Sequence, residues 1–282
     1  CIRDSTSSLA LAETHCRTLL QEFPDFRAAP ANLGAIYWAF AQWDLWHGRD
    51  PGHWLARGRE VIEQHLSRNP RYAQARNNLA TLLLIEAVWL QWQGQSAAPT
   101  LARAWAMVSE ADVAEADRNA YITRLELAVA HLREAGLQGA PTTEAVSQLN
   151  QQLAETLRER PGEWDVLAAA AEARLLVASL SSPGQAPQLL MQGYEELQRS
   201  AEQYPRHAGI CRLQFAYAVA LPPHRAEKRE AENQARACRK RWQDSRIFEF
   251  FQWQLDGTAG HRTSWPGVER CLLYTSPSPR DS

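Results

Sequence analysis

The sequence has no long uninterrupted run of apolar residues. Its most apolar segment, from Leu79 to Leu90, is interrupted by Glu86. A helix needs about 20 mostly apolar residues to cross the hydrocarbon core of a bilayer. The sequence therefore predicts no membrane span.

An excess of charge of one sign is also missing. The 30 basic and 32 acidic residues leave a formal net charge of -2. The charged run from His224 to Lys240 mixes both signs at helical spacing, which is typical of a solvated helix face. Binding to nucleic acid depends on a concentrated positive patch. We therefore expect no nucleic-acid partner.

The cysteines show no pairing pattern. The five lie at positions 1, 16, 211, 238 and 271, an odd number without a C-x-x-C pair or a metal-ligand spacing. Such usage is typical of reducing compartments. We therefore expect a cytoplasmic protein.

Motifs for catalysis and for cofactor binding are absent as well. The sequence contains no G-x-S-x-G, no G-x-G-x-x-G and no G-x-x-x-x-G-K. No pair of histidines has the H-E-x-x-H spacing, and His47 and His53 are interpreted as solvated residues beside a turn. We expect a non-enzymatic chain without a cofactor or a metal.

An internal repeat is the main feature that is present. A shift of 46 residues places Leu33 on Leu79 and Trp43 on Trp89. A glycine followed within five residues by a proline recurs at Gly48, Gly94, Gly139 and Gly184. A second breaker closes the units at Pro24, Pro70, Pro161 and Pro205, with Asp117 in place of the missing one. Two breakers per period predict two elements per period.

Both elements of a unit are predicted to be helices. The three-and-four spacing of one helix face is seen first at Leu33, Ile36, Tyr37 and Phe40 and then at Leu55, Gly58, Ile62 and Leu66. Glycine can end the first helix in the left-handed conformation, and Asp50 with Pro51 can start the second.

These landmarks resemble the tetratricopeptide repeat. The resemblance rests on Leu33-Gly34 with Tyr37, and on the second helix that ends at Pro70 before Asn77-Asn78-Leu79-Ala80. The standard period is about 34 residues, and we attribute the additional residues to a long turn between the helices. The Gly48-Arg49-Asp50-Pro51 turn is similar to the long-looped repeat tails of bacterial serine/threonine kinases. The resemblance implies an all-α, right-handed superhelical solenoid of stacked hairpins with a period of about 45 residues.

The repeats are expected to fill residues 1–255. After a partial unit with a helix over 8–22, the fuller units are predicted at 27–70, 71–117, 118–161, 162–205 and 206–243. The fifth replaces its long turn by Pro222-Pro223, and a final helix is predicted over 245–255. We expect residues 256–270 to be disordered, and 271–282 resemble a translated sequencing adaptor. Because the chain starts at Cys1 inside a repeat, we expect an internal fragment whose N-terminal domain is missing.

The tryptophans and a few polar residues are candidates for function. Trp43, Trp46, Trp89 and Trp92 recur beside the turn, where they are predicted to anchor it; an exposed aromatic platform is the alternative. Tetratricopeptide proteins turn other first-helix positions toward a concave groove that holds an extended peptide. The candidate peptide-binding residues of this chain are Trp38, Asn77, Asn78, Thr81 and Arg124.

The function implied by the resemblance is a non-enzymatic scaffold that binds a protein or peptide in this groove. It would serve as the regulatory or docking tail of a bacterial signalling protein such as a serine/threonine kinase. The alternative is a repeat module of a transcriptional regulator or of a secretion- or envelope-associated protein. The coding sequence upstream of Cys1 would discriminate between these.

Overall fold

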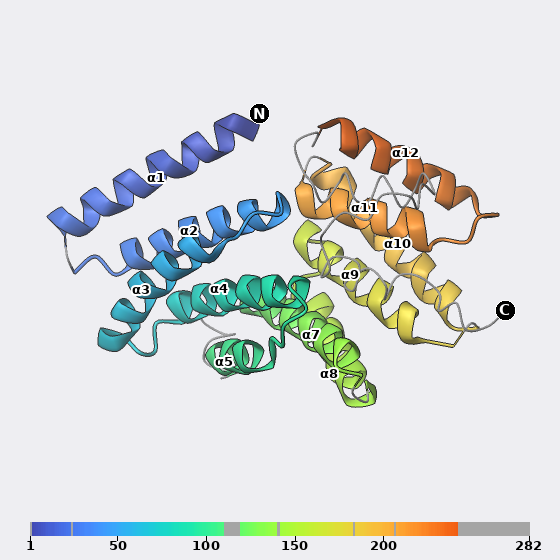
Figure 1. The fold of residues 1–282 in the computed structure, drawn as a ribbon, viewed down its shortest axis with the longest axis horizontal. Coiled ribbons are helices and arrows are strands. Elements are labelled where there is room, and N and C mark those ends of the chain that lie inside the picture. Colours follow the sequence, from blue (N-terminus) through green and yellow to red (C-terminus); the bar gives the residue numbers. More distant parts are fainter. Residues whose placement is uncertain are drawn as a thin grey trace. The chain divides into compact units, whose positions relative to one another are not determined.

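The computed structural model describes residues 2–23, 25–109, 119–139, 142–182, 184–205 and 207–241, with side chains from residue 7 onward. These ranges contain eleven helices and no strand (Figure 1). The prediction of an all-α fold is confirmed. None of these helices is both long and apolar enough to cross a membrane. The expected helix at 245–255, the segments 256–270 and 271–282, and the turn residues Pro24, Asp117 and Pro141 lie outside the described residues.

The helices that follow α1 (Ile2–Glu22) come in pairs. The first helices of the pairs are α2 (Ala28–Trp46), α4 (Ala73–Trp92), α7 (Ala120–Leu137), α9 (Trp164–Leu180) and α11 (Ala208–Ala220). The second helices are α3 (Gly52–Arg68), α5 (Ala98–Val108), α8 (Thr143–Glu159), α10 (Ala186–Gln203) and α12 (Ala226–Arg241). Each stretch that was predicted as a unit between 27 and 243 therefore contains one pair.

The connections inside the pairs correct the expectation of a long turn. Each pair is joined by five residues, at 47–51, 93–97, 138–142, 181–185 and 221–225. The connection that contains Pro222-Pro223 is as long as the others. The residues by which each unit is longer than a standard repeat lie in the helices and not in the turn. For example, α2 has 19 residues and α4 has 20.

Glycine ends three of the first helices as predicted. Gly48, Gly94 and Gly139 adopt φ values of 67°, 71° and 64°, in the left-handed region that favours glycine. Gly184 does not, because α9 ends at Leu180 and the next residue, Ser181, already has an extended backbone. Asp50 accepts a hydrogen bond from the backbone N–H of Gly52, the first residue of α3, at 2.8 Å. Pro51 precedes the helix and does not occupy its first position as expected.

Burial alternates between the two helices of a pair. The first helix α2 contains ten buried residues, whereas its partner α3 contains four. The same contrast holds between α9, with nine buried residues, and α10, with five. A helix that is apolar on most sides needs protein around it, whereas an amphipathic helix leaves one side in water. The first helices therefore form the interior, and the second helices cover it.

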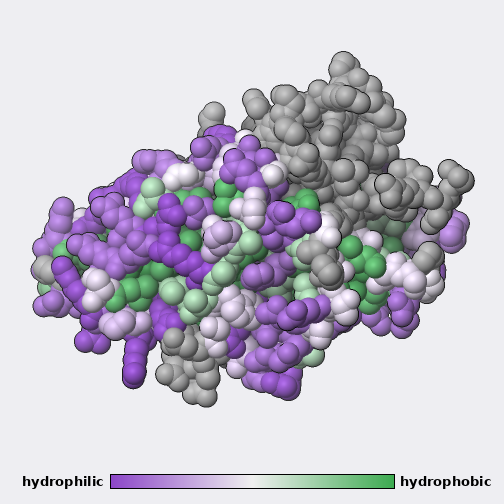
Figure 2. Space-filling model, turned by 60° about the horizontal axis from the view of Figure 1, so that its bottom comes forward, coloured by the Kyte–Doolittle hydropathy of each residue, from purple (hydrophilic) through white to green (hydrophobic). Residues whose placement is uncertain are grey.

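The chain divides into two compact units. The first contains residues 1–90 and 96–130, and the second contains 91–95 and 131–282. Tyr37 is fully buried in the first unit while its neighbour Trp38 is half-buried, so only one of the two rings belongs to the core. On the face drawn in Figure 2, hydrophilic residues cover much of the described surface and hydrophobic residues form patches between them.

The first helix of the chain packs against the helix that follows it. Leu9 and Leu20 of α1 lie against a cluster on α2. Leu11 lies outside this contact and is 60% exposed.

Two helices of the second unit approach closely at a glycine. A Cβ atom placed on Gly193 of α10 would overlap the hydroxyl oxygen of Tyr217 on α11. This hydroxyl is buried and donates a hydrogen bond to the backbone oxygen of Ala171 at 2.7 Å. The tyrosine can therefore move aside only by giving up this bond.

We predict that Gly193→Ala lowers the free energy of unfolding by about 2 kcal/mol, although alanine favours a helix, because the added methyl group overlaps the Tyr217 hydroxyl. Urea denaturation measures the change. Gly184→Ala is the matched control and should be close to neutral, since a Cβ atom there meets nothing within 4 Å. Tyr217→Phe should partly relieve the Gly193→Ala defect, and equal losses at both glycines would contradict the close contact.

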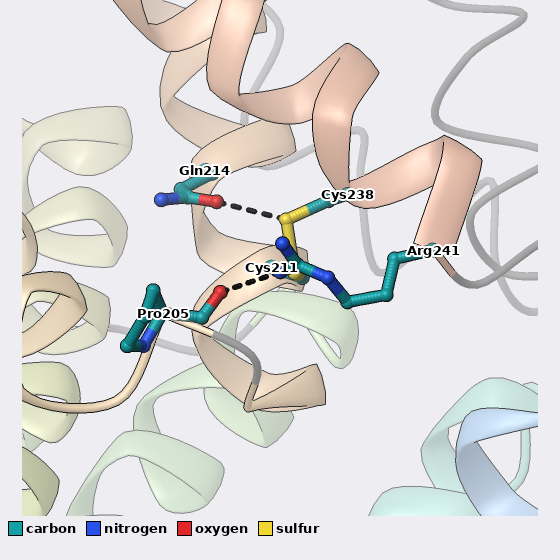
Figure 3. The surroundings of a disulfide bond; sticks show 5 residues. All are labelled: Pro205, Cys211, Gln214, Cys238 and Arg241. Carbon is teal, nitrogen blue, oxygen red and sulfur yellow. Dashed lines mark hydrogen bonds between the residues drawn. A yellow bond between two sulfur atoms is a disulfide. The ribbon is translucent and has the colours of Figure 1, made fainter. Parts of the chain in front are cut away.

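The last described pair is joined by a disulfide. Cys211 of α11 and Cys238 of α12 are bonded, with their Cα atoms 5.6 Å apart and a sequence separation of 27 positions. Both are buried, and Gln214 Oε1 lies 2.9 Å from Cys238 Sγ (Figure 3). Arg241 also donates a hydrogen bond to the backbone oxygen of Pro205 at 2.7 Å. The expectation of a reducing compartment did not anticipate this bond, because disulfides persist mainly in oxidising environments.

We predict that replacing both cysteines, Cys211→Ala and Cys238→Ala, lowers the free energy of unfolding by about 3 kcal/mol, since the unfolded chain loses a crosslink that closes a loop of this length. Urea denaturation without reductant measures the loss. Cys16→Ala is the control, because Cys16 is a free thiol. Identical unfolding midpoints for the double variant and the parent would show that the bond does not form in solution.

Candidate functional site

The five predicted peptide-binding residues lie on three first helices. Trp38 is on α2, the three residues Asn77, Asn78 and Thr81 are on α4, and Arg124 is on α7. The α4 residues share a little more than one turn, and the Thr81 hydroxyl donates a hydrogen bond to the backbone oxygen of Asn77 at 3.1 Å. Trp38 and Thr81 are half-buried, whereas the two asparagines and the arginine are buried.

Asn78 connects two neighbouring first helices. Its side-chain Nδ2 donates a hydrogen bond to the backbone oxygen of Ala31 on α2 at 2.8 Å, and the residue is 8% exposed. The amide was predicted to hold a peptide backbone. In the structure one of its two N–H groups is bound to the backbone of the chain itself.

Arg124 has a similar internal partner. Its Nε donates a hydrogen bond to the backbone oxygen of Val108, the last residue of α5, at 2.6 Å. Arg76 of α4 donates to the two preceding carbonyls, those of Met107 at 3.0 Å and Ala106 at 3.1 Å. The last carbonyls of a helix lack partners within the helix and favour a nearby cation. The two arginines therefore cap α5, a role that the sequence analysis missed for Arg76 and did not assign to Arg124.

Asn77 differs from its neighbour Asn78. It is 4% exposed, and its Oδ1 has no hydrogen-bond partner within the part of the chain that the structure describes. A buried acceptor without a donor costs roughly 1–3 kcal/mol. Among the five predicted peptide-binding residues, Asn77 is therefore the one whose side-chain oxygen receives no hydrogen bond from the described residues.

A charged cluster in the second unit was not foreseen. Glu172 of α9 accepts hydrogen bonds from Arg133 of α7 at 2.8 Å and from Arg212 of α11 at 2.5 Å. Burial alone would raise the pKa of Glu172, but the charges and hydrogen bonds of Arg212 and Arg133 outweigh burial and lower this pKa to about 2. One carboxylate therefore links three consecutive first helices.

The described side chains include no metal site. Within the ranges that the structure covers, no group of three or more His, Cys, Asp or Glu residues is placed to hold a metal ion.

His207 is packed against the ring of Trp164, with 4.7 Å between the ring centroids. Burial lowers the pKa of His207 to about 4, which keeps this imidazole neutral at pH 7.

Comparison with known proteins does not assign the chain to a family. The sequence matches no protein-family model and no curated protein. The likeness to tetratricopeptide proteins and to kinase tails therefore remains an expectation that rests on the residues quoted above.

We predict opposite effects for the two adjacent asparagines. Asn78→Ala should lower the free energy of unfolding by about 1–2 kcal/mol, because the bond to Ala31 is lost. Asn77→Ala should leave stability unchanged or slightly raised, since it removes an acceptor without a donor. Thermal and urea unfolding of the two variants measure both effects. A clear loss of stability in Asn77→Ala would mean that its oxygen has an internal partner.

We predict that Glu172→Gln lowers the free energy of unfolding by about 3 kcal/mol at pH 7, because the parent carboxylate has a pKa of about 2 in the folded state and 4.5 when unfolded. A lowered folded pKa gives stability that is present above pH 4.5 and is lost as the pH falls toward 2. The difference between parent and variant should therefore shrink below pH 4.5. Urea denaturation at pH 7 and pH 3 tests this, with the exposed Glu195→Gln as control. A difference that does not depend on pH would contradict the assignment.

Proposed function

We propose that the chain is a non-enzymatic scaffold of stacked helical hairpins, similar to tetratricopeptide proteins, that binds an extended segment of a partner protein along its first helices. Three features support the proposal. The helices are paired, their connections all have five residues, and the first helices start 44 to 47 residues apart, at 28, 73, 120, 164 and 208. Regular pairs of this kind bury apolar surface only against their neighbours and leave a long face for binding.

The observation that carries the proposal is the buried oxygen of Asn77. An extended peptide presents backbone N–H groups at regular intervals, and one of them would supply the donor that this oxygen lacks. The half-buried Trp38 and Thr81 lie on α2 and α4 and would contribute an aromatic surface and a hydroxyl. Asn78 and Arg124 act in this proposal by fixing the backbone around the groove.

The biological role follows from the resemblance. The scaffold would be the regulatory or docking tail of a bacterial signalling protein such as a serine/threonine kinase. One observation favours the alternative of a secretion- or envelope-associated protein. The buried Cys211–Cys238 disulfide is typical of an oxidising compartment and disagrees with a cytoplasmic location.

Selection of peptides tests the binding function. Random 12-residue peptides displayed on phage are selected against the full chain, and the enriched peptides are synthesised and titrated by calorimetry. Asn77→Ala should weaken binding at least about tenfold while stability is retained, since one hydrogen bond to the bound peptide is lost. Trp38→Ala should also weaken it.

A control variant on the exposed side of a second helix tests whether the loss of peptide affinity is specific to the groove. Glu195→Ala on α10 should leave the affinity unchanged. If no peptide is enriched, or if the enriched peptides bind Asn77→Ala and the parent equally, the proposed groove is wrong. The coding sequence upstream of Cys1 separates the two roles, because a kinase domain supports the first and a signal peptide supports the second.

A further inference from the structure

The helix α1 is held less firmly than the other described helices. None of its residues from 7 to 22 is buried, whereas every other described helix contains buried residues. On its outer side, Leu11 is 60% exposed and Leu19 is 37% exposed. Because buried apolar area is the main source of helix docking energy, we expect α1 to dock less tightly than the helices that contain buried residues.

The inner side of α1 fits the first hairpin through a repeated apolar pattern. Leu9, Ala12, Cys16 and Leu20 follow one another at intervals of three or four residues. They pack against a cluster formed by Leu33, Ile36, Tyr37 and Phe40, with Trp54 and Val61 beside it. This is how an amphipathic helix occupies a groove on a partner, with one stripe of anchors. Figure 1 shows α1 lying along α2.

A polar cluster fixes the register of α1 in this groove. One carboxylate oxygen of Glu13 accepts hydrogen bonds from Arg57 at 2.6 Å and from the Tyr37 hydroxyl at 3.0 Å. It also accepts one from Arg17 of α1 itself at 2.9 Å. Two guanidinium groups and a phenol therefore converge on a single carboxylate. Burial would raise the pKa of Glu13, but these partners outweigh it and lower the pKa.

The receptor side of this cluster is built without α1. The guanidinium of Arg57 lies over the rings of Tyr37, at 4.7 Å, and Trp54, at 5.5 Å. Trp54 stacks on Phe40 with 4.4 Å between ring centroids, and its indole N–H donates to Asp44 at 2.8 Å. All of these residues belong to α2 and α3. Without α1, the Arg57 guanidinium would lack the carboxylate that neutralises its charge, and the Tyr37 hydroxyl would lose Glu13 as its acceptor.

We propose that the face of α2 and α3 that carries Arg57, Tyr37 and Trp54 is a binding site for an acidic amphipathic helix of another protein, and that α1 is its intramolecular occupant. The partner helix needs apolar anchors spaced like those of α1 and a carboxylate directly after the second anchor. Charge complementarity with Arg57 selects an acidic residue at that position. The site uses none of the residues of the proposed peptide groove, so either proposal can fail while the other stands.

A labelled peptide measures the capacity of this site. The probe is a fluorescein-labelled peptide of residues 7–22 that carries Cys16→Ser, and its binding to the full chain is followed by fluorescence anisotropy. Ala12→Arg in the full chain places a charged side chain against the apolar cluster on α2 and should release α1. This variant should bind the probe at least tenfold more tightly than the parent does, because the parent site is occupied.

Matched variants separate the proposed site from unspecific binding. Leu11→Arg lies on the exposed side of α1 and should bind the probe as weakly as the parent. Adding Arg57→Ala to Ala12→Arg, or Glu13→Gln to the probe, should weaken binding at least tenfold. Circular dichroism confirms that the variants are folded, and Leu20→Asp serves as a second releasing variant if Ala12→Arg is unfolded.

Three results would overturn the proposal. The first is that neither releasing variant binds the probe more tightly than the parent. The second is that binding to the released chain does not depend on Arg57 or on Glu13 of the probe. The third is that the released chain sediments as a dimer through exchange of α1, which would make a second copy the occupant in place of another protein.

Discussion

The structure depends on the burial of the first helix of each pair. A helix such as α2 or α9 is apolar on most of its circumference and is stable only when other helices surround it. The amphipathic second helices supply one side of that surrounding. Small residues make the approach possible, as at Gly193, where the Tyr217 hydroxyl occupies the space of a side chain.

Polar groups on the buried helices are constrained by the same burial. An unpaired polar group in the interior costs more than a made hydrogen bond contributes, so the fold uses most of its buried polar side chains internally. Asn78 binds a backbone oxygen, Arg76 and Arg124 cap α5, and Glu172 joins two arginines. The Asn77 oxygen is among the buried polar atoms for which the described residues supply no hydrogen-bond partner, and the proposed function depends on it.

Much of the helical framework could be predicted from the sequence because its signals are local. The spacing that starts at Leu33 marks a buried helix face, and Gly48 and Gly94 take the left-handed turn that a glycine before a proline suggests. The length of the turns was misjudged. A comparison with a shorter standard repeat does not tell whether additional residues extend a helix or a loop, and here they extend the helices.

The side-chain contacts were harder to predict because they join residues that are far apart in the sequence. Spacing places Arg124 on a first helix, but not the carbonyl of Val108 beside its guanidinium. Cys211 and Cys238 are 27 residues apart, and only the antiparallel packing of α11 and α12 makes them neighbours. The Arg133–Glu172–Arg212 cluster likewise joins residues about 40 positions apart, which no local pattern connects.

Native-state hydrogen exchange of the backbone amides tests most directly whether the first helices form the interior. The exchange of each helix can be followed in the full chain by mass spectrometry after proteolysis. If burial of the first helices holds the structure together, amides in the middle of α2, α4, α9 and α11 should exchange far more slowly than those of α3 and α10. Equal protection in both sets, or better protection of the second helices, would contradict this account.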